Sequence, residues 1–299
     1  MTVKLASSPV AEHDQKKHIF TRRRFLYGGG IAAAGMALYS GEIARHEISI
    51  VTRDIAIRNL PPAFAGFRIA QISDIHYDEF TEPWFVDRVI DQVNALQPDL
   101  VAFTGDYISF APLPRSYVLG AMQRCAAAMA RVACPHRYAV MGNHDSFLGA
   151  PTIRPILADF DLPLLVNEHV PVEREGQRLW IVGIHDPVTH TPDLEAAIPA
   201  RPDGPVVLLS HGPDYADTLV ADPRGKLVDL MLSGHSHGGQ VRFPLVGALH
   251  TPEGGQKYVE GLFRLGEMQL YVNRGIGTVG LPFRLNCPPE ITVFKLARA

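Results

Sequence analysis

The sequence predicts an α/β fold whose central sheet is partly parallel. Short apolar runs at 67–72, 100–104 and 137–141 alternate with segments that have helical periodicity, which is the order of a βαβαβ unit. The 26 glycines and 24 prolines separate these runs instead of forming a low-complexity block, which indicates many strand-to-loop transitions. With 299 residues, 46% of them hydrophobic, the chain is long enough to bury a large core.

The individual elements follow from hydrophobic periodicity and from turn residues. Alternating apolar and polar residues at 48–52 and 55–57 predict an antiparallel strand or hairpin. Apolar residues on one face predict a helix from about Phe85 to Leu96, with Thr81 as its cap, Pro83 in its first turn and Pro98 after its end. Further elements are expected as a helix near 117–131 and strands at 178–183, 206–209, 227–232, 268–272 and 291–294.

The amino-terminal segment differs from the rest of the chain. Residues 1–24 contain six basic and two acidic residues, a net charge of +4, and an apolar, glycine-rich run follows at 25–39. That run is shorter than the roughly 18–20 residues of a confident membrane span. The stretch from Thr21 to Leu26 reads TRRRFL and resembles a twin-arginine export signal. Residues 1–45 are therefore predicted to be an export signal, or an uncleaved signal anchor, in front of one domain at 46–299.

Such a signal implies that the twin-arginine export machinery is a partner of the chain. The expected location is the periplasm or the outer face of the cytoplasmic membrane, with the segment either removed or retained as a membrane anchor. The net charge of −3, which becomes −7 without the first 24 residues, argues against a nucleic-acid partner. Cys125 and Cys134 could bridge in an oxidising compartment, but the sequence favours buried free thiols.

Polar motifs follow five of the predicted strands. They read D-x-H, G-D, G-N-H-D, S-H-G-P-D and G-H-S-H-G-G-Q, and their candidate metal ligands are Asp74, His76, Asp106, Asn143, His211, His235 and His237. Functional groups of open α/β sheets gather at the carboxyl ends of strands. Oxygen and imidazole donors without thiolate suit Zn, Mn or Fe, and seven donors exceed what one tetrahedral ion needs. The motifs together predict a site for two divalent metal ions.

This ordered set of motifs, from Arg68 to Gln240, resembles the calcineurin-like metallophosphoesterase superfamily. The later stretches 273–278 and 288–292 resemble its branch of exported bacterial phosphohydrolases of the YkuE/YaeI type. The resemblance implies a metallophosphoesterase α/β-sandwich, in which two mixed β-sheets pack together and are flanked by helices. It places Asp74, His76 and His237 on one metal and Asn143, His211 and His235 on the other, with Asp106 bridging both. His144 and Asp145 are the implied catalytic residues, with His144 beside the scissile phosphate and Asp145 orienting it or raising its basicity.

The activity implied by the resemblance is metal-dependent hydrolysis of a phosphate ester, with a phosphodiester favoured. A hydroxide that bridges the two metals would attack, and His144 would assist the leaving group. One alternative is an enzyme of the UDP-2,3-diacylglucosamine pyrophosphatase type, and another is a catalytically dead binding scaffold. The export signal argues against the first alternative, because its nucleotide substrate would be met in the cytoplasm. The complete ligand set and His144 argue against the second.

Three further assignments stay open in the sequence. Asp214 could orient His211 or cap a following helix, and Arg274 could bind a substrate phosphate or form a structural salt bridge. Phe263, Leu281 and Phe283 could line an apolar rim suited to a lipid tail, or they could belong to the core.

Overall fold

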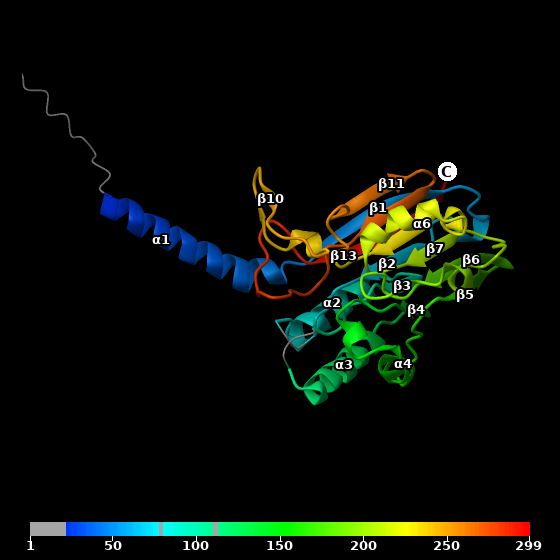
Figure 1. Ribbon diagram of the computed structural model, residues 1–299, viewed down its shortest axis with the longest axis horizontal. Helices are drawn as coiled ribbons and strands as arrows, with labels where there is room; N and C mark the ends of the chain where they lie inside the picture. Colours follow the sequence, from blue (N-terminus) through cyan, green and yellow to red (C-terminus); the bar gives the residue numbers. More distant parts are fainter. Residues whose placement is uncertain (1–21, 78–79, 110–112) are drawn as a thin grey trace, which may run out of the picture. The chain divides into compact units, whose positions relative to one another are not determined.

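The computed structural model describes residues 22–77, 80–109 and 113–299 (Figure 1). The chain divides into two compact units, Met1–Leu38 and Tyr39–Ala299, and the second is called the main unit below. The described part of the first unit is helix α1 (Arg22–Leu38), in which no residue is buried. Residues 1–21, which include three lysines and Thr21 of the predicted export signal, lie outside the described residues. Across the described ranges, no helix combines the length and the hydropathy needed to cross a membrane.

The first sheet of the main unit has five strands. Their spatial order is β1 (Ser49–Ile57), β13 (Glu290–Arg298), β2 (Arg68–Ile72), β3 (Leu100–Phe103) and β4 (His136–Ala139). Strands β2, β3 and β4 run parallel, whereas β13 is antiparallel to β2 and parallel to β1. The predicted βαβαβ unit therefore forms the parallel part of a mixed sheet.

The second sheet has six strands and is also mixed. Their order is β11 (Gly261–Leu265), β12 (Met268–Val272), β8 (Leu230–Ser233), β7 (Val206–Leu209), β6 (Gln177–Gly183) and β5 (Glu168–Arg174). The four central strands are parallel, and the two edge strands are antiparallel to their neighbours. A separate two-stranded hairpin is formed by β9 (Arg242–Phe243) and β10 (Gly247–Ala248).

Helices cover the outer faces of both sheets. Helices α2 (Pro83–Leu96), α3 (Arg115–Ala130) and α4 (Ala150–Ala158) share a buried cluster with β2 and β3. Helices α5 (Leu194–Ala197) and α6 (Ala216–Ala221) share another with β7 and β8. Short helical turns lie at η1 (Tyr39–Ile43), η2 (Ala44–His46), η3 (Pro62–Phe64), η4 (Asp145–Phe147), η5 (Pro213–Tyr215), η6 (Gly225–Leu227) and η7 (His237–Gly239).

The main core lies between the two sheets. Ile69 and Leu100 of the first sheet belong to the same buried cluster as Val207 and Leu230 of the second. Apolar side chains on the inner faces of two sheets must be covered together to leave water, and this burial supplies the driving force for the sandwich. The predicted α/β-sandwich of two mixed sheets flanked by helices is confirmed.

Two local predictions are wrong. The stretch predicted as an antiparallel strand or hairpin is the single strand β1, which pairs in parallel with β13 from Ser49–Glu290 to Ile57–Arg298. Apolar alternation reports which face of a strand is buried, but it carries no information about the direction of a partner more than 200 residues away. The N-cap of α2 is Glu82 and not Thr81, and Pro83 occupies the first turn.

All three cysteines are free and buried, so Cys125 and Cys134 do not form a disulfide bond in this structure.

The carboxyl ends of five parallel strands meet at one edge of the sandwich. Within the first sheet, the Asp74 N–H donates to the Gly105 carbonyl (2.9 Å). Between the sheets, the Gln71 side-chain amide donates to the Ser233 carbonyl (2.9 Å). The loops after β2, β3, β4, β7 and β8 are therefore brought together, and these loops carry the predicted site residues.

Candidate metal centre

The structure brings all seven candidate ligands into one buried region. Asp74 and His76 follow β2, Asp106 follows β3, Asn143 follows β4, His211 follows β7, and His235 and His237 follow β8. Six of the seven are buried, and Asn143 is half-buried. Their donor atoms form two clusters that share one carboxylate.

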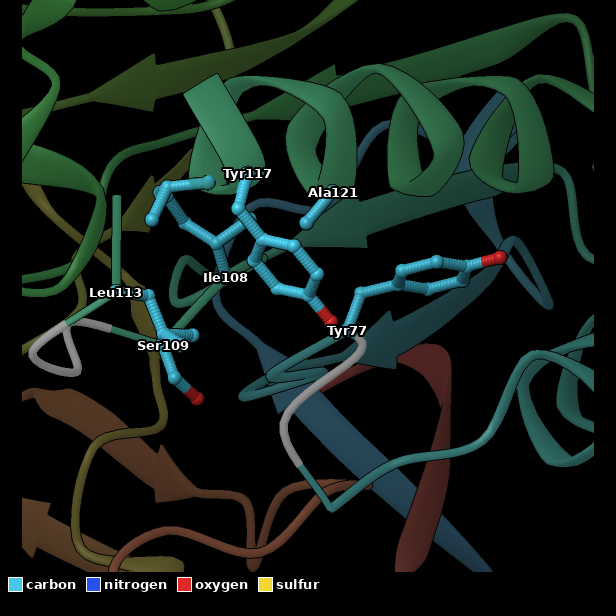
Figure 2. Close-up of a pocket in the computed structure, with 7 residues that line it drawn as sticks. Tyr77, Ile108, Ser109, Leu113, Tyr117 and Ala121 are labelled. Carbon is cyan, nitrogen blue, oxygen red and sulfur yellow. The ribbon is translucent and has the colours of Figure 1, made fainter. Parts of the chain in front are cut away.

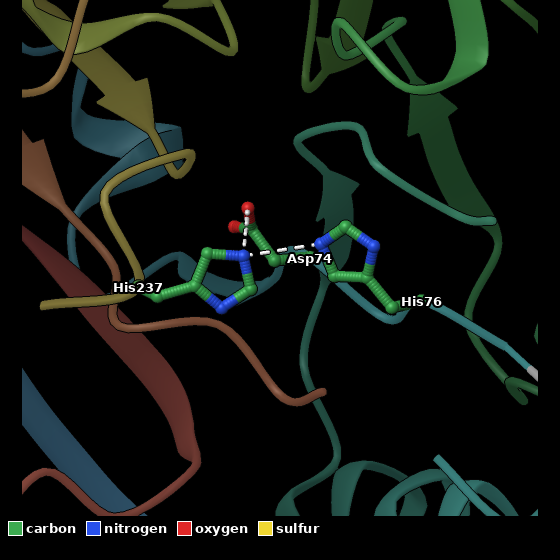
Figure 3. A group of neighbouring side chains, drawn as sticks. All are labelled: Asp74, His76 and His237. Atoms are coloured by element: carbon green, nitrogen blue, oxygen red, sulfur yellow. Dashed lines mark hydrogen bonds and ion pairs between the residues drawn. The ribbon is translucent and has the colours of Figure 1, made fainter. Parts of the chain in front are cut away.

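The first cluster contains Asp74, His76 and His237 (Figure 3). The Nε2 atoms of His76 and His237 are 3.1 Å apart. The Nε2 atom of His237 is also 3.4 Å from Oδ1 of Asp74. Two imidazole nitrogens and one carboxylate oxygen thus face a common point.

The second cluster is centred on Nε2 of His211. This atom is 3.1 Å from Oδ2 of Asp106, 3.2 Å from Oδ1 of Asn143 and 3.2 Å from Nδ1 of His235. The same Asp106 oxygen is 3.6 Å from Nε2 of His76 in the first cluster. The Asp106 carboxylate therefore lies between the two clusters.

Backbone carbonyls determine which nitrogen of two histidines points into the site. Nδ1 of His211 donates to the Thr104 carbonyl (2.7 Å), and Nε2 of His235 donates to the Glu253 carbonyl (2.7 Å). Each ring therefore directs its other nitrogen inward, an arrangement typical of metal-bound histidine. Inward lone pairs beside an amide oxygen and a carboxylate repel one another unless a cation lies between them, so the donor set fits divalent metal ions.

The electrostatics of the centre favour neutral imidazoles at three positions. Burial lowers the pKa of His76 to about 3 and that of His235 to about 4, and burial also holds the pKa of His237 well below its usual value. Burial would lower the pKa of His211 as well, but the charge and hydrogen bond of Asp106 outweigh it and raise that pKa well above normal. Neutral imidazole is the form that binds a metal, whereas the proton on His211 is one that a metal ion would displace.

Backbone conformation at the site is unusual. Five of the seven candidate ligands adopt positive φ, namely Asp74 (51°), His76 (47°), Asp106 (56°), His235 (70°) and His237 (51°). Left-handed backbone costs an L-residue other than glycine about 1–2 kcal/mol, and such strain concentrates at functional sites. Gly142 permits close approach of the loops, because a Cβ atom there would lie 2.1 Å from Oδ1 of Asp106.

This strain predicts an inverted order of stability for two variants of one residue. His235→Gly is expected to be more stable than His235→Ala by about 1 kcal/mol, because glycine tolerates positive φ and alanine does not. Urea unfolding of both variants in the presence of a chelator measures the difference in their free energy of unfolding. Both variants lack the imidazole, so its loss does not affect the comparison. At His211, which is not among the positive-φ residues, the alanine variant should be the more stable of the pair. The usual order at both positions would contradict the left-handed geometry.

The candidate catalytic residues His144 and Asp145 lie beside Asp106, where the two clusters meet. The Asp145 carboxylate accepts hydrogen bonds from the backbone N–H groups of Gly142 (2.8 Å), Asp106 (2.7 Å) and Tyr107 (2.9 Å). In return, Oδ1 of Asp106 accepts from the backbone N–H of His144 (2.9 Å). These bonds, called the Asp145 latch below, hold the loops after β3 and β4 in a fixed relation. The ring of His144 packs edge-on against that of His76, with centroids 4.8 Å apart.

Sequence reasoning missed Thr104, Glu253 and Ser109. Thr104 and Glu253 act through backbone carbonyls, which leave no signal in the pattern of side chains. The Ser109 hydroxyl lies 3.0 Å from Nδ1 of His76, so it contacts the ring nitrogen that faces away from the centre. Ser109 also lines a small pocket with Tyr77 and Tyr117, shown in Figure 2. That pocket therefore adjoins the first cluster.

The structure also shows the contacts of the residues whose roles stayed open in the sequence. The Asp214 carboxylate accepts backbone N–H groups of residues 256–258. Arg274 forms an ion pair with Glu290, in keeping with the structural alternative. Phe263 packs against Tyr258 with ring centroids 5.0 Å apart, whereas Leu281 is exposed.

Comparisons with known proteins agree on one family. The model of the family described as calcineurin-like phosphoesterase matches residues 67–239. The metallophosphoesterase YkuE of Bacillus subtilis is 31% identical over 288 residues, covering 92% of this chain and 97% of YkuE. The phosphodiesterase YaeI of Escherichia coli is 31% identical over 298 residues, covering 93% of this chain and 100% of YaeI.

Some relatives carry names that mention a membrane. A transmembrane protein with metallophosphoesterase domain from Danio rerio is 29% identical over 284 residues, covering 90% of this chain and 62% of that protein. The match of the family model and the identity to YkuE and YaeI along nearly their full lengths agree with the two donor clusters around Asp106. The chain is a dinuclear metal-dependent hydrolase and belongs to the calcineurin-like phosphoesterase family.

Proposed function

We propose that the chain hydrolyses a phosphate ester, with a phosphodiester favoured over a monoester. The observation that carries the proposal is the sharing of Asp106 by two clusters of metal donors. Seven oxygen and imidazole donors in this arrangement suit a pair of divalent ions better than one. The name of YaeI, a phosphodiesterase, supports the preference for a diester.

The proposed ligand sets follow the two clusters. Asp74, His76 and His237 hold one ion, and Asn143, His211 and His235 hold the other, with Asp106 between them. Two bound divalent ions would supply an acidified water near neutral pH and would neutralise the phosphate oxygens. The chain itself contributes the neutral imidazoles, the shared carboxylate and the exclusion of bulk water from a buried site.

We propose that His144 assists the departure of the leaving group. This side chain is half-buried, and one ring nitrogen lies within 4.8 Å of donor atoms of both His76 and Asp106. A histidine in that position can give a proton to the leaving oxygen or stabilise its charge. The Asp145 latch orients His144 through the backbone, because it fixes the loop from which the ring projects.

Metal analysis coupled to a panel of esters tests the proposed reaction. Purified protein is expected to contain close to two equivalents of Mn, Zn or Fe, and chelation should remove both the metal and the turnover of bis-p-nitrophenyl phosphate. Adding back one divalent metal at a time should restore activity and identify the effective ion. The value of kcat/KM should be higher for this diester than for p-nitrophenyl phosphate.

Two outcomes would overturn this assignment. Full turnover by protein that contains no metal would reject the dinuclear reaction. A kcat/KM that is highest for a UDP-linked pyrophosphate would favour a pyrophosphatase of the UDP-2,3-diacylglucosamine type instead.

We also propose that residues 1–45 direct export and that residues 46–299 form the phosphoesterase domain. The support is the twin-arginine-like sequence at 21–26, whose three arginines begin helix α1, and the uncharged remainder of that helix. The location would then be outside the cytoplasm, either free or held at the outer face of the cytoplasmic membrane.

Replacing the arginine pair tests this route. In the full chain, Arg22→Lys with Arg23→Lys is expected to abolish most of the exported fraction, measured by cell fractionation. Arg24→Lys is the matched control, because it removes a neighbouring arginine but leaves the pair intact. Export that does not depend on Arg22 and Arg23 would reject the twin-arginine route.

A further inference from the structure

The β9–β10 hairpin carries large apolar side chains into solvent. At its tip, Leu245 is 108% exposed and Val246 is 71% exposed, and Leu249 follows at 61%. The backbone of Leu245 has φ of 68°, a left-handed conformation in which glycine or asparagine is expected and a leucine is strained. A strained, fully exposed leucine does nothing for folding, so this tip is a candidate for binding.

Two other segments extend the apolar surface of the hairpin. Leu281 is exposed on the loop before β13, and Tyr39 and Ile43 are exposed on η1. Backbone hydrogen bonds join these segments, from the Arg242 N–H to the Leu285 carbonyl (2.9 Å) and from the Arg284 N–H to the Ser40 carbonyl (3.0 Å). Figure 1 shows the hairpin labelled β10 and the loop before β13 at the same end of the main unit.

We define the apolar end patch as the exposed residues Tyr39, Ile43, Leu245, Val246, Leu249 and Leu281. The described part of the main unit exposes twelve large hydrophobic side chains, and half of them belong to this patch. A concentration of this kind on a soluble domain marks an interaction surface, whereas single exposed hydrophobic residues do not.

We infer that the apolar end patch docks on the surface of a lipid bilayer. The chain enters the patch at Tyr39 directly from α1, whose 17 residues include three arginines at the start and no acidic residue. A basic start followed by an apolar run is the composition that lipid headgroups and acyl chains attract. The patch is therefore covalently continuous with a segment that itself suits a membrane.

The charges near the patch favour binding by insertion of apolar side chains into the bilayer over electrostatic attraction to lipid headgroups. Arg242 pairs with Glu260 (2.8 Å), and Arg45 pairs with Glu82 (3.1 Å), so these two cations are already neutralised. The chain beyond residue 24 carries a net charge of −7, which repels an anionic surface. Tyr39 adds an aromatic side chain of the kind found at membrane–water interfaces.

The patch is attached to the metal centre through η7. Gly239, two residues after His237, packs on the hairpin so closely that a Cβ atom there would lie 2.2 Å from Cβ of Ala248. A guanidinium N–H of Arg242 also donates to the Gly238 carbonyl (2.9 Å). A docked patch would thus hold the centre beside the bilayer. The inference does not depend on the proposed reaction, and its test needs no substrate.

A fluorescent label at the hairpin tip tests the docking in the full chain. Val246→Cys is labelled with nitrobenzoxadiazole, which is selective because the three native cysteines are buried. With vesicles of phosphatidylcholine, we expect a blue shift, a rise in emission and quenching by nitroxide-labelled lipid. The matched control is a label at Leu262→Cys, an exposed residue on β11 outside the patch, whose emission should not change.

A variant of the patch gives a second measurement. Replacing Leu245, Val246 and Leu249 by serine should weaken partition into the same vesicles by at least about tenfold, since three exposed apolar side chains lose their burial in lipid. Because these residues are exposed, the circular dichroism spectrum and the thermal midpoint should not change.

Three results would overturn the inference. In the first, the label at position 246 keeps its aqueous emission while the chain sediments with vesicles, which would show that another segment binds alone. In the second, binding requires phosphatidylglycerol and is abolished by salt, which would point to the basic segment. In the third, the label shifts without lipid as the chain self-associates, which would make a second copy the occupant.

Discussion

Asp106→Asn is expected to lower kcat/KM for bis-p-nitrophenyl phosphate by about a thousandfold or more. Oδ2 of Asp106 faces His211 at 3.1 Å and His76 at 3.6 Å, so the amide removes the charged oxygen shared by both clusters. Metal ions supply several kcal/mol of transition-state stabilisation, and each 1.4 kcal/mol corresponds to a factor of ten. Metal content should fall from about two equivalents to fewer than one. Asn143→Ala should also abolish metal-dependent hydrolysis, through the second cluster.

The control for this variant is a half-buried carboxylate away from the centre. Asp229 accepts the Val206 N–H (2.9 Å) between β7 and β8, so Asp229→Asn removes a comparable charge without touching either cluster. It should keep its metal and its turnover. Circular dichroism and thermal unfolding should show that the Asp106 variant is folded. Wild-type turnover by folded Asp106→Asn protein would refute the shared role of this carboxylate.

His144→Ala is expected to reduce kcat by about a hundredfold to ten-thousandfold, the range for loss of a general acid. The backbone N–H of residue 144, which holds Asp106 at 2.9 Å, remains in the variant, so the metal content should stay at the wild-type level. The loss should be larger for an alkyl phosphodiester than for a p-nitrophenyl ester, because p-nitrophenolate departs without protonation. The measurement is kcat for both esters, together with metal analysis.

The dependence on the leaving group separates two roles for His144. A side chain that only positions the substrate would lower turnover of both esters by the same factor. Loss of metal in His144→Ala would instead make the residue a ligand. Either result would contradict the assignment of His144 to the departing oxygen.

The layered fold was predictable because its parallel strands are continuous apolar runs. Strands such as β7, buried along all four of its residues, have no polar face that could mislead the assignment. The direction of β1 could not be predicted, because it depends on β13 at the other end of the chain. The hairpin β9–β10 has two residues in each strand, too few for any periodicity to appear.

The side chains of the centre were visible in the sequence, but their supports were not. Asp74, Asp106 and His211 each follow an apolar run, and the rule that polar groups gather at strand ends predicts that they meet. The Thr104 and Glu253 carbonyls, which select the inward nitrogen of His211 and His235, have no signature in residue type. Asp145 was singled out for chemistry on His144, whereas its carboxylate binds three backbone amides of two loops.

The Asp145 latch has a consequence for what the enzyme can select. It connects the loop that carries Asp106 with the loop that carries His144. In the proposed reaction, the shared metal ligand and the residue beside the leaving group therefore keep a fixed separation. A fixed separation of these two loops suits one kind of reacting centre, a tetrahedral phosphorus, and does not distinguish between the groups attached to it. Discrimination among esters must then come from surfaces outside these two loops, such as the Ser109 pocket and the apolar end patch.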